Sequence, residues 1–257
     1  MPNKSLGQHW LKDRSMLESV VVPANLTDQD TVLEIGPGLG TLTSVLLSKA
    51  NQVFAVEFDQ ALARKLPGQF PGKKLTVIHH DILTFDLSTL PKNYKVVANV
   101  PYYITSKIIE KLLNASNKPS NITLLVQKEV AERLAARPGD MSILAISAQI
   151  FADVTLHDIV PASFFTPPPK VDSQIVSLKT LSQPLISEED EKLFFRVVKA
   201  GFSAKRKKLR SSLAGGLQLD KEKSDKLLDS AKISGDRRAE DLTINEWLRL
   251  MKEYQEL

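Results

Sequence analysis

The segment Thr31–Thr41, TVLEIGPGLGT, joins a short apolar stretch to three closely spaced glycines and then to a helix-like pattern. Residues 31–35 are short, β-branched and almost continuously apolar, which is typical of a strand covered on both faces. Gly36, Gly38 and Gly40 allow the backbone to turn sharply and a ligand to approach it closely. A strand, a glycine-rich turn and a helix in this order predict an open α/β sheet with a ligand site at its carboxyl edge.

The same alternation of short apolar stretches and helix-like patterns continues to about residue 180. Further strands are predicted at 52–57, 75–79, 95–99, 122–126, 154–160 and 173–178. Helices are predicted at 41–50, 60–66, 106–114, 128–136 and 143–151. This alternation predicts a Rossmann-like α/β domain with a doubly wound, mostly parallel sheet of seven strands and right-handed crossovers.

The pattern changes to helices alone after residue 180. Ser187 is followed by the acids Glu188, Glu189 and Asp190, which suits a helix start because a serine caps the free N–H groups and acids favour the positive end of the helix dipole. Later helices are predicted at 205–214, 221–231 and 244–254. We therefore predict two domains, an α/β domain over residues 1–180 and a small all-α C-terminal domain over residues 181–257.

The composition narrows the class of protein. The chain has 257 residues, of which 42% are hydrophobic and 25% charged, which is typical of a globular protein. The sequence has no run of 18 apolar residues, so we expect no membrane span. Because a motif-like segment begins as early as Leu6, we expect no cleaved leader and a cytoplasmic location.

Cysteine is absent from the sequence. Its absence excludes disulfides, zinc–thiolate sites and iron–sulfur clusters from this chain, as well as a thiolate nucleophile. The four histidines show no ligand spacing, so we predict no metal site.

The positive charge is unevenly distributed, although the net charge is only +4. Between residues 192 and 219 there is no acid, and there are eight cations: Lys192, Arg196, Lys199, Lys205, Arg206, Lys207, Lys208 and Arg210. A solvated helix face is the ordinary explanation of such a run. Five of the six residues from 205 to 210 are cations, and this high density of positive charge favours a polyanionic partner, namely nucleic acid.

Acidic residues follow the next two predicted strands. Glu57 ends the second strand and can accept hydrogen bonds from two ribose hydroxyls, and Asp81 follows the third strand, where it can accept one from an adenine amine. Thr41 stands where the NAD-binding pattern needs a third glycine, so the loop departs from that pattern. Each acid alone could be an ordinary strand-end residue, but together with the glycine loop they predict a nucleoside cofactor.

The tetrapeptide Asn99-Val100-Pro101-Tyr102 ends the fourth predicted strand. An exocyclic adenine amine is a weak nucleophile because its lone pair is delocalised into the ring. The Asn99 side-chain oxygen and the Val100 backbone oxygen can accept its two N–H bonds and so favour a pyramidal nitrogen. Pro101 stiffens the turn, and Tyr102 offers a face on which an extruded base can stack. The alternative is an ordinary turn after a strand.

Over nearly its whole length, the sequence resembles the ribosomal RNA adenine dimethyltransferases of the KsgA/RsmA type. The segments that carry the resemblance are LGQHWL at 6–11, GPGLG at 36–40 with Glu57 and Asp81, NVPY at 99–102, FTPPPKVDS at 165–173 and the basic segment from Gly201 to Leu209. The sequence departs from the family's pattern at two places: His9 stands where some relatives have asparagine, and the segment at 137–142 is shorter than the family's loop.

The resemblance implies S-adenosylmethionine as the cofactor and assigns roles to individual residues. Cofactor contacts are implied at His9, Leu11, Gly36, Gly38, Glu57, Asp81 and Asn99. Catalytic roles fall to Asn99, Val100, Pro101, Tyr102 and Phe165, with Phe165 near the target base. RNA contacts are expected at Lys205, Arg206, Lys207, Lys208 and Arg210. The implied reaction is dimethylation of two adjacent adenosines near the 3′ end of small-subunit (16S) rRNA, on an immature 30S subunit, by what we expect to be a monomer.

Three alternatives stay open on the sequence alone. Tyr103 and Lys107 have the spacing of a short-chain dehydrogenase pair. The macrolide-resistance methylases, which modify large-subunit rRNA, share the NxPY-type turn. A non-catalytic RNA-binding assembly factor is the third alternative, although the glycine loop and Asn99 are both intact.

Overall fold

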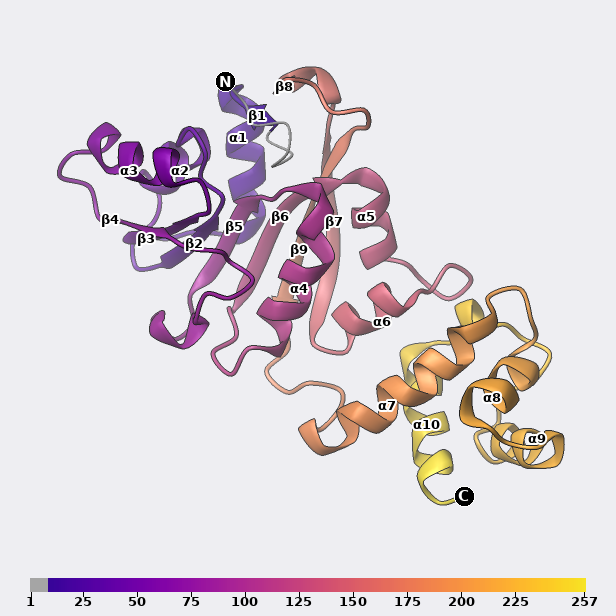
Figure 1. The fold of residues 1–257 in the computed structure, drawn as a ribbon. Coiled ribbons are helices and arrows are strands. Elements are labelled where there is room, and N and C mark those ends of the chain that lie inside the picture. Colours follow the sequence, from indigo (N-terminus) through magenta and orange to yellow (C-terminus); the bar gives the residue numbers. More distant parts are fainter. Residues whose placement is uncertain (1–8) are drawn as a thin grey trace. The chain divides into compact units, whose positions relative to one another are not determined.

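The computed structural model describes residues 9–257, so the predicted motif residues 6–8 lie outside the described residues. The chain forms two compact units (Figure 1). The first consists of the chain up to Glu132 together with Ala152–Leu181, and the second of Arg133–Phe151 together with Ser182–Leu257. Residues 143–151, which the sequence pattern placed with the first 180 residues, thus belong by their contacts to the second unit.

The first unit contains all the strands of the described chain. In chain order its elements are β1 (Trp10–Leu11), α1 (Arg14–Val21), β2 (Thr31–Ile35), α2 (Thr41–Leu46), β3 (Gln52–Glu57), α3 (Gln60–Gln69), β4 (Leu75–His79), β5 (Lys95–Asn99), α4 (Thr105–Asn114), β6 (Asn121–Gln127), α5 (Lys128–Leu134, which runs into the second unit), β7 (Ala152–Val160), β8 (Phe165–Thr166) and β9 (Ser173–Thr180).

Seven of these strands form one mixed sheet in the order β4-β3-β2-β5-β6-β9-β7. All neighbouring pairs are parallel except those of β9, which runs against both β6 and β7. The predicted doubly wound, mostly parallel sheet is therefore confirmed. The chain moves from β2 outward to β4 and then returns to β5 on the other side, so the topological switch point lies between β2 and β5. Ligands bind at such a point, outside the carboxyl ends of the strands.

The core of this unit joins the sheet to α1 and α2. Val32, Val53 and Val97 are fully buried in the sheet, and Leu17 and Val45 pack against them from the two helices. Burying a side chain of this size contributes roughly 1.5–3 kcal/mol. Because several strands share these contacts, the packed core holds the carboxyl ends of β2, β3 and β5 in fixed positions.

The second unit contains the helices α6 (Ile143–Gln149), α7 (Glu188–Gly201), α8 (Leu209–Leu217), α9 (Lys221–Ser230) and α10 (Ile244–Gln255). Ser187 caps α7 by accepting a hydrogen bond from the Asp190 N–H, which confirms the predicted helix start. Trp247 is fully buried at the centre of this unit. It lies against Gly201, where a Cβ atom would come within 2.4 Å of the Trp247 ring.

The predicted helix at 205–214 begins later, at Leu209. Residues 205–208 form a turn instead. The N–H groups of Leu209 and Arg210 donate to the carbonyls of Arg237 and Gly235, so a distant loop satisfies the first turn of α8.

No described helix has both the length and the hydropathy that a bilayer crossing requires. Among residues 9–257, no three His, Cys, Asp or Glu side chains are grouped as metal ligands would be.

Candidate active site

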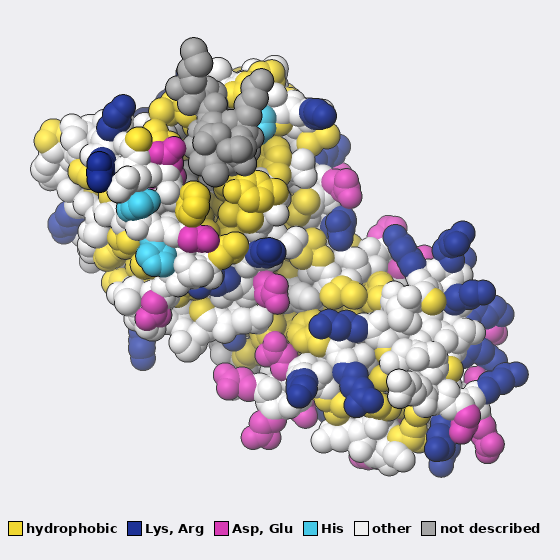
Figure 2. Space-filling model, viewed as in Figure 1, with side chains coloured by type: hydrophobic (Ala, Val, Ile, Leu, Met, Phe, Trp, Pro, Cys, Tyr) yellow, Lys and Arg dark blue, Asp and Glu magenta, His cyan; other side chains and the backbone are white. Residues whose placement is uncertain are grey.

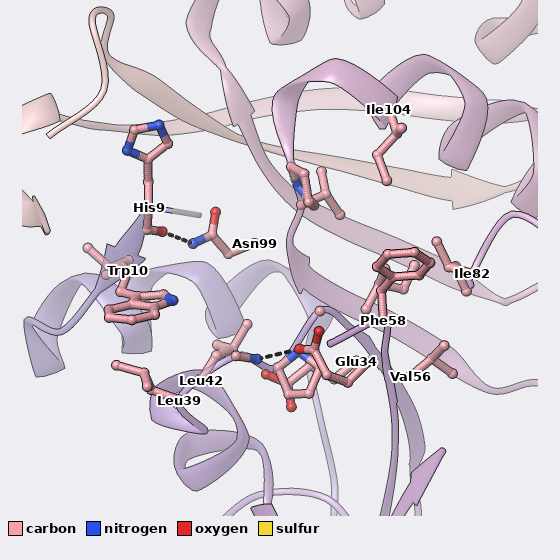
Figure 3. A pocket seen from close by; sticks show the side chains of 18 of the residues that line it. His9, Trp10, Glu34, Leu39, Leu42, Val56, Phe58, Ile82, Asn99 and Ile104 are labelled. Atoms are coloured by element: carbon pink, nitrogen blue, oxygen red, sulfur yellow. Dashed lines mark hydrogen bonds between the residues drawn. The ribbon is translucent and has the colours of Figure 1, made fainter. Parts of the chain in front are cut away.

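A cavity of about 250 Å³ lies at the switch point of the sheet. Its walls come from the carboxyl ends of β2, β3, β4 and β5, and from β1, which comes from the start of the described chain (Figure 3). All the predicted cofactor residues line this cavity, and so does the predicted Asn-Val-Pro-Tyr turn.

The glycine loop after β2 has the backbone conformation that requires glycine. Gly36, Gly38 and Gly40 all have positive φ, at 67°, 56° and 80°. Side chains are strained there, and at Gly40 a Cβ atom would also lie 2.7 Å from the Leu66 side chain. The loop therefore follows the cavity wall with its backbone exposed to whatever binds.

Glu57 connects the end of β3 to this loop. Its carboxylate accepts one hydrogen bond from the Gly38 N–H at 3.0 Å and another from the Asp59 N–H at 2.8 Å, and the residue is 6% exposed. Each oxygen of a carboxylate has two lone pairs, so both keep acceptor capacity on the cavity side. This arrangement suits the two adjacent hydroxyls of a ribose.

Asp81 follows β4 at the same edge of the sheet. Its Oδ1 accepts a hydrogen bond from the Leu83 N–H at 2.9 Å, which holds the turn. Ile82 is buried in the wall beside it, and the exposed ring of Phe58 lies near Ile82 (Figure 3). An acceptor in a wall that also carries these apolar side chains matches an adenine ring with an amino group.

Asn99 is held at the tip of β5 by the first described residue. Its Nδ2 donates to the backbone oxygen of His9 at 3.3 Å (Figure 3), and no described residue donates to its Oδ1. The amide therefore has its donor side engaged and its acceptor oxygen available. Val100 is buried next to it, and the hydroxyl of Tyr102 shares a hydrogen bond of 2.7 Å with Ser173 Oγ.

The segment at residues 9–11 ties several of the predicted motifs together. His9 Nδ1 donates to the Pro167 carbonyl at 2.7 Å, and its ring stacks on Tyr102 with 5.9 Å between the ring centres. The Leu11 carbonyl accepts from Thr41 Oγ1 at 2.9 Å. Trp10 pairs with Thr166 in the small antiparallel sheet of β1 and β8. His9 and Leu11 thus both line the cavity and fix its wall.

Phe165 differs in its position from the other predicted catalytic residues. It is 3% exposed and belongs to the hydrophobic core, where it pairs with Leu11 across β1 and β8, and it does not line the cavity. The pairing of β1 with β8 places the buried Leu11 opposite Phe165. This burial is evidence for a packing role, and the predicted role beside the target base stays a prediction.

We expect Phe165→Leu to lower the free energy of unfolding by about 1 kcal/mol and to leave kcat within about twofold, because leucine keeps most of the apolar volume. Thermal unfolding and single-turnover kinetics measure the two effects. A tenfold loss of kcat without a loss of stability would show instead that the ring contacts the substrate.

Two side chains of the cavity were not singled out from the sequence. Glu34 lies in β2, is 1% exposed and has no hydrogen-bond partner for its Oε2. Burial, together with the nearby charge of Glu57, raises the pKa of Glu34 to about 8, so the side chain is mostly protonated at neutral pH. The indole Nε1 of Trp10 is buried and also has no partner. The signal for Glu34 was present in the sequence, as an acid inside an otherwise apolar strand.

The hydrogen-bonding groups of the cavity wall fit an adenosine cofactor with a charged tail. Glu57 and Asp81 supply acceptors for a nucleoside, and the buried groups without partners at Glu34 and Trp10 supply an acceptor and a donor elsewhere in the wall. S-adenosylmethionine has a nucleoside at one end and an amino acid at the other, so its polar groups match these positions.

The predicted basic cluster divides into paired and unpaired cations. Lys208 pairs with Asp236 at 2.8 Å, and Arg210 lies 3.6 Å from Asp225 and 3.7 Å from Asp236. Lys205, Arg206 and Lys207 are exposed and form no ion pair within the part of the chain that the structure describes. Many Lys and Arg side chains lie on the visible face of the second unit (Figure 2).

The dehydrogenase alternative gains no support from the geometry. Tyr103 is 64% exposed and Lys107 is also exposed. Tyr103 lines the cavity, but Lys107 does not, so the pair is not brought together there.

Comparison with known proteins identifies the family. The family model described as "Ribosomal RNA adenine dimethylase" matches residues 2–256. A ribosomal RNA small subunit methyltransferase A from Dehalococcoides mccartyi is 42% identical over 98% of this chain and 88% of its own length. The protein of the same name from Clostridium acetobutylicum is 39% identical over 98% of this chain and 93% of its own.

Two solved structures are similar along almost the whole chain. A dimethyladenosine transferase from Plasmodium falciparum has a TM-score of 0.84 at 29% identity and covers 96% of this chain and 98% of its own. The 23S rRNA methyltransferase ErmE has a TM-score of 0.78 at 28% identity and covers 96% of this chain and 99% of its own. The match along almost the entire sequence shows that the chain belongs to the ribosomal RNA adenine dimethylase family.

Proposed function

We propose that this protein is an S-adenosylmethionine-dependent enzyme that dimethylates the N6 atoms of two adjacent adenosines in small-subunit rRNA. The family supports the reaction, and relatives at 39–42% identity that are named for the small subunit support the substrate. The single observation that carries the proposal is the Asn99 amide, whose oxygen is available at the switch point while its nitrogen is engaged by His9.

The cofactor would be held by the residues that line the cavity. Glu57 would accept the ribose hydroxyls, Asp81 the adenine amine, and the backbone of the Gly36–Gly40 loop would follow the tail. Bound S-adenosylmethionine supplies an electrophilic methyl group on a sulfonium. Because β1 covers this wall, His9 and Leu11 would exclude water from it.

The substrate amine would be activated by two oxygen acceptors. Asn99 Oδ1 and the Val100 carbonyl each accept one N–H of the amine, which localises the lone pair on nitrogen. Pro101 lacks an N–H and so offers no competing donor. The rate then comes from positioning and electrostatics, because the nitrogen loses its proton readily once it is methylated.

Tyr102 would provide the stacking surface for the extruded base. Its hydroxyl is fixed by Ser173 and its ring by His9, so little side-chain entropy is lost when a base stacks on it. Stacking of one base on an aromatic ring contributes about 1–3 kcal/mol.

The second unit would bind rRNA through the turn at 205–207. Lys205, Arg206 and Lys207 are the exposed cations of the predicted cluster that no acid neutralises among the described residues, whereas Lys208 and Arg210 hold the loop that contains Asp236. We assign the phosphate contacts to the first three, and a supporting role to the other two. We further propose that the first unit, which holds most of residues 1–180, is the catalytic domain, and that the second unit, residues 182–257 together with 133–151, is the rRNA-binding domain.

We expect the triple variant Lys205→Ala, Arg206→Ala, Lys207→Ala to weaken RNA binding and to flatten its salt dependence. The slope of log Kd against log salt should fall by about 0.7–0.9 for each phosphate that is no longer neutralised. The matched control removes the same charge from exposed positions of α9, as Lys221→Ala, Lys223→Ala, Lys226→Ala. Equal slopes for the two triple variants would show that only net charge matters.

The function is tested by methyl transfer to purified particles. Labelled S-adenosylmethionine is offered with under-methylated small subunits, and separately with protein-free large-subunit rRNA. Mass spectrometry should find N6,N6-dimethyladenosine in the first sample alone. Label confined to the large-subunit rRNA would assign the chain to the ErmE type of activity instead. We further propose that the substrate is an immature 30S particle and that a monomer acts on it in the cytoplasm.

A further inference from the structure

One hydrogen-bond donor of the cavity wall has no partner. The indole Nε1 of Trp10 is buried from solvent, and no described residue accepts its proton. Trp10 belongs to β1 and lines the cavity, and its indole nitrogen points towards the cavity in Figure 3. A buried N–H without an acceptor is unfavourable, so an acceptor that arrives with a ligand would remove that penalty.

The backbone of Gly38 lies beside this donor. A Cβ atom at Gly38 would lie 3.5 Å from Trp10 Nε1, so glycine there leaves the N–H edge next to bare backbone. The neighbouring Leu11 is tied to the start of α2 through the Thr41 hydroxyl. The indole is therefore presented by a strand that is anchored on α2, directly after the glycine loop.

The position of Trp10 indicates which part of the cofactor it would meet. Glu57 and Asp81 are at the ends of β3 and β4, and the nucleoside would bind there. Trp10 and Leu39 lie at the opposite end of the cavity from Phe58 and Ile82 (Figure 3). A nucleoside bound at the first end places the amino-acid tail at the second.

The chemistry of the tail selects one of its two charged groups. An indole N–H can only donate, an ammonium can only donate, and a carboxylate can only accept. We propose that Trp10 donates its Nε1–H to the carboxylate of the bound cofactor and thereby favours adenosine ligands that carry the amino-acid tail. This inference rests on the proposed function, because it requires the cofactor to occupy this cavity.

Two ligands that differ in the tail test the inference. Isothermal titration calorimetry measures the Kd of S-adenosylhomocysteine, which has the carboxylate, and of 5′-methylthioadenosine, which lacks the whole amino acid. Trp10→Phe keeps an aromatic ring and removes the donor. We expect the variant to bind S-adenosylhomocysteine roughly tenfold more weakly, on the scale of a hydrogen bond to a charged group, and 5′-methylthioadenosine within about twofold of the wild type.

The matched control is Trp247→Phe, the same change at the other tryptophan, which lies in the second unit and should leave both Kd values unaltered. Thermal unfolding checks that each variant is folded. Equal weakening of both ligands by Trp10→Phe would show a packing role and overturn the inference, as would no weakening of either. A wild type that binds neither ligand would contradict the proposed function itself, and the inference with it.

Discussion

We expect the Asn99→Ala variant to lose roughly 30- to 1,000-fold in kcat, equivalent to about 2–4 kcal/mol, which is the scale of removing a group that stabilises a transition state. The reason is that alanine removes one of the two acceptors for the substrate amine. The Kd of S-adenosylhomocysteine should change only a few-fold, because the nucleoside contacts at Glu57 and Asp81 are intact. Single-turnover methylation and calorimetry measure the two quantities separately.

The control for this variant is Asn114→Ala, the same substitution at an exposed position at the end of α4. It should leave both kcat and the Kd unchanged. Near-wild-type turnover of Asn99→Ala would contradict the role of the amide. A parallel loss of turnover and cofactor affinity would place Asn99 in the cofactor site alone.

The second large effect concerns the pH dependence of stability. Glu34 is buried and its pKa is raised to about 8, first by burial and then by the charge of Glu57. In the unfolded chain the same carboxyl titrates near its ordinary value of 4.5. Between these two values the folded state binds the extra proton, so the free energy of unfolding falls as the pH rises from about 4.5 to about 8 and levels off above that.

Glutamine at position 34 imitates the protonated carboxyl and removes this dependence. We expect Glu34→Gln to match the wild type near pH 5 and to be more stable by roughly 3–5 kcal/mol above pH 8. Urea unfolding of the cofactor-free protein between pH 5 and 9 measures the difference. Glu110→Gln, at an exposed position of α4, is the control and should track the wild type. Parallel curves for Glu34→Gln and the wild type would show that Glu34 does not titrate in this range.

The main strands could be predicted from the sequence because each is a local pattern. Residues 31–35, 52–57, 75–79 and 95–99 are apolar runs between polar turns, and the structure has strands with these same bounds. Ser187 signals the start of α7 through the acids that follow it. Such signals lie within a few residues of the element that they specify.

Elements that depend on distant partners could not be predicted in this way. β1 and β8 have two residues each and exist only because they pair with one another. The burial of Phe165 follows from that pairing, so its sequence motif alone did not reveal it. Helix α1 was also missed, although Asp13 caps it and Leu17, Val20 and Val21 face the core.

The cavity residues show the same limit. The positions of Glu57, Asp81 and Asn99 at strand ends follow from the alternating pattern, because parallel strands bring their carboxyl ends to one edge. The contact of Asn99 with His9 joins residues 90 positions apart, and the pairing of Lys208 with Asp236 joins residues 28 positions apart. No pattern in the neighbouring sequence signals either contact. The hydrogen bond from Asn99 to His9 nevertheless orients the amide, and the ion pair with Asp236 neutralises Lys208 while Lys205, Arg206 and Lys207 stay unpaired among the described residues.

The most direct test of the account is a crystal structure of the protein with S-adenosylhomocysteine and adenosine monophosphate. We predict that the N6 atom of the adenine lies about 3 Å from both Asn99 Oδ1 and the Val100 carbonyl oxygen, the usual hydrogen-bond distance. A structure in which the Asn99 amide is turned away from the cofactor, with no room beside it for a base, would contradict the account.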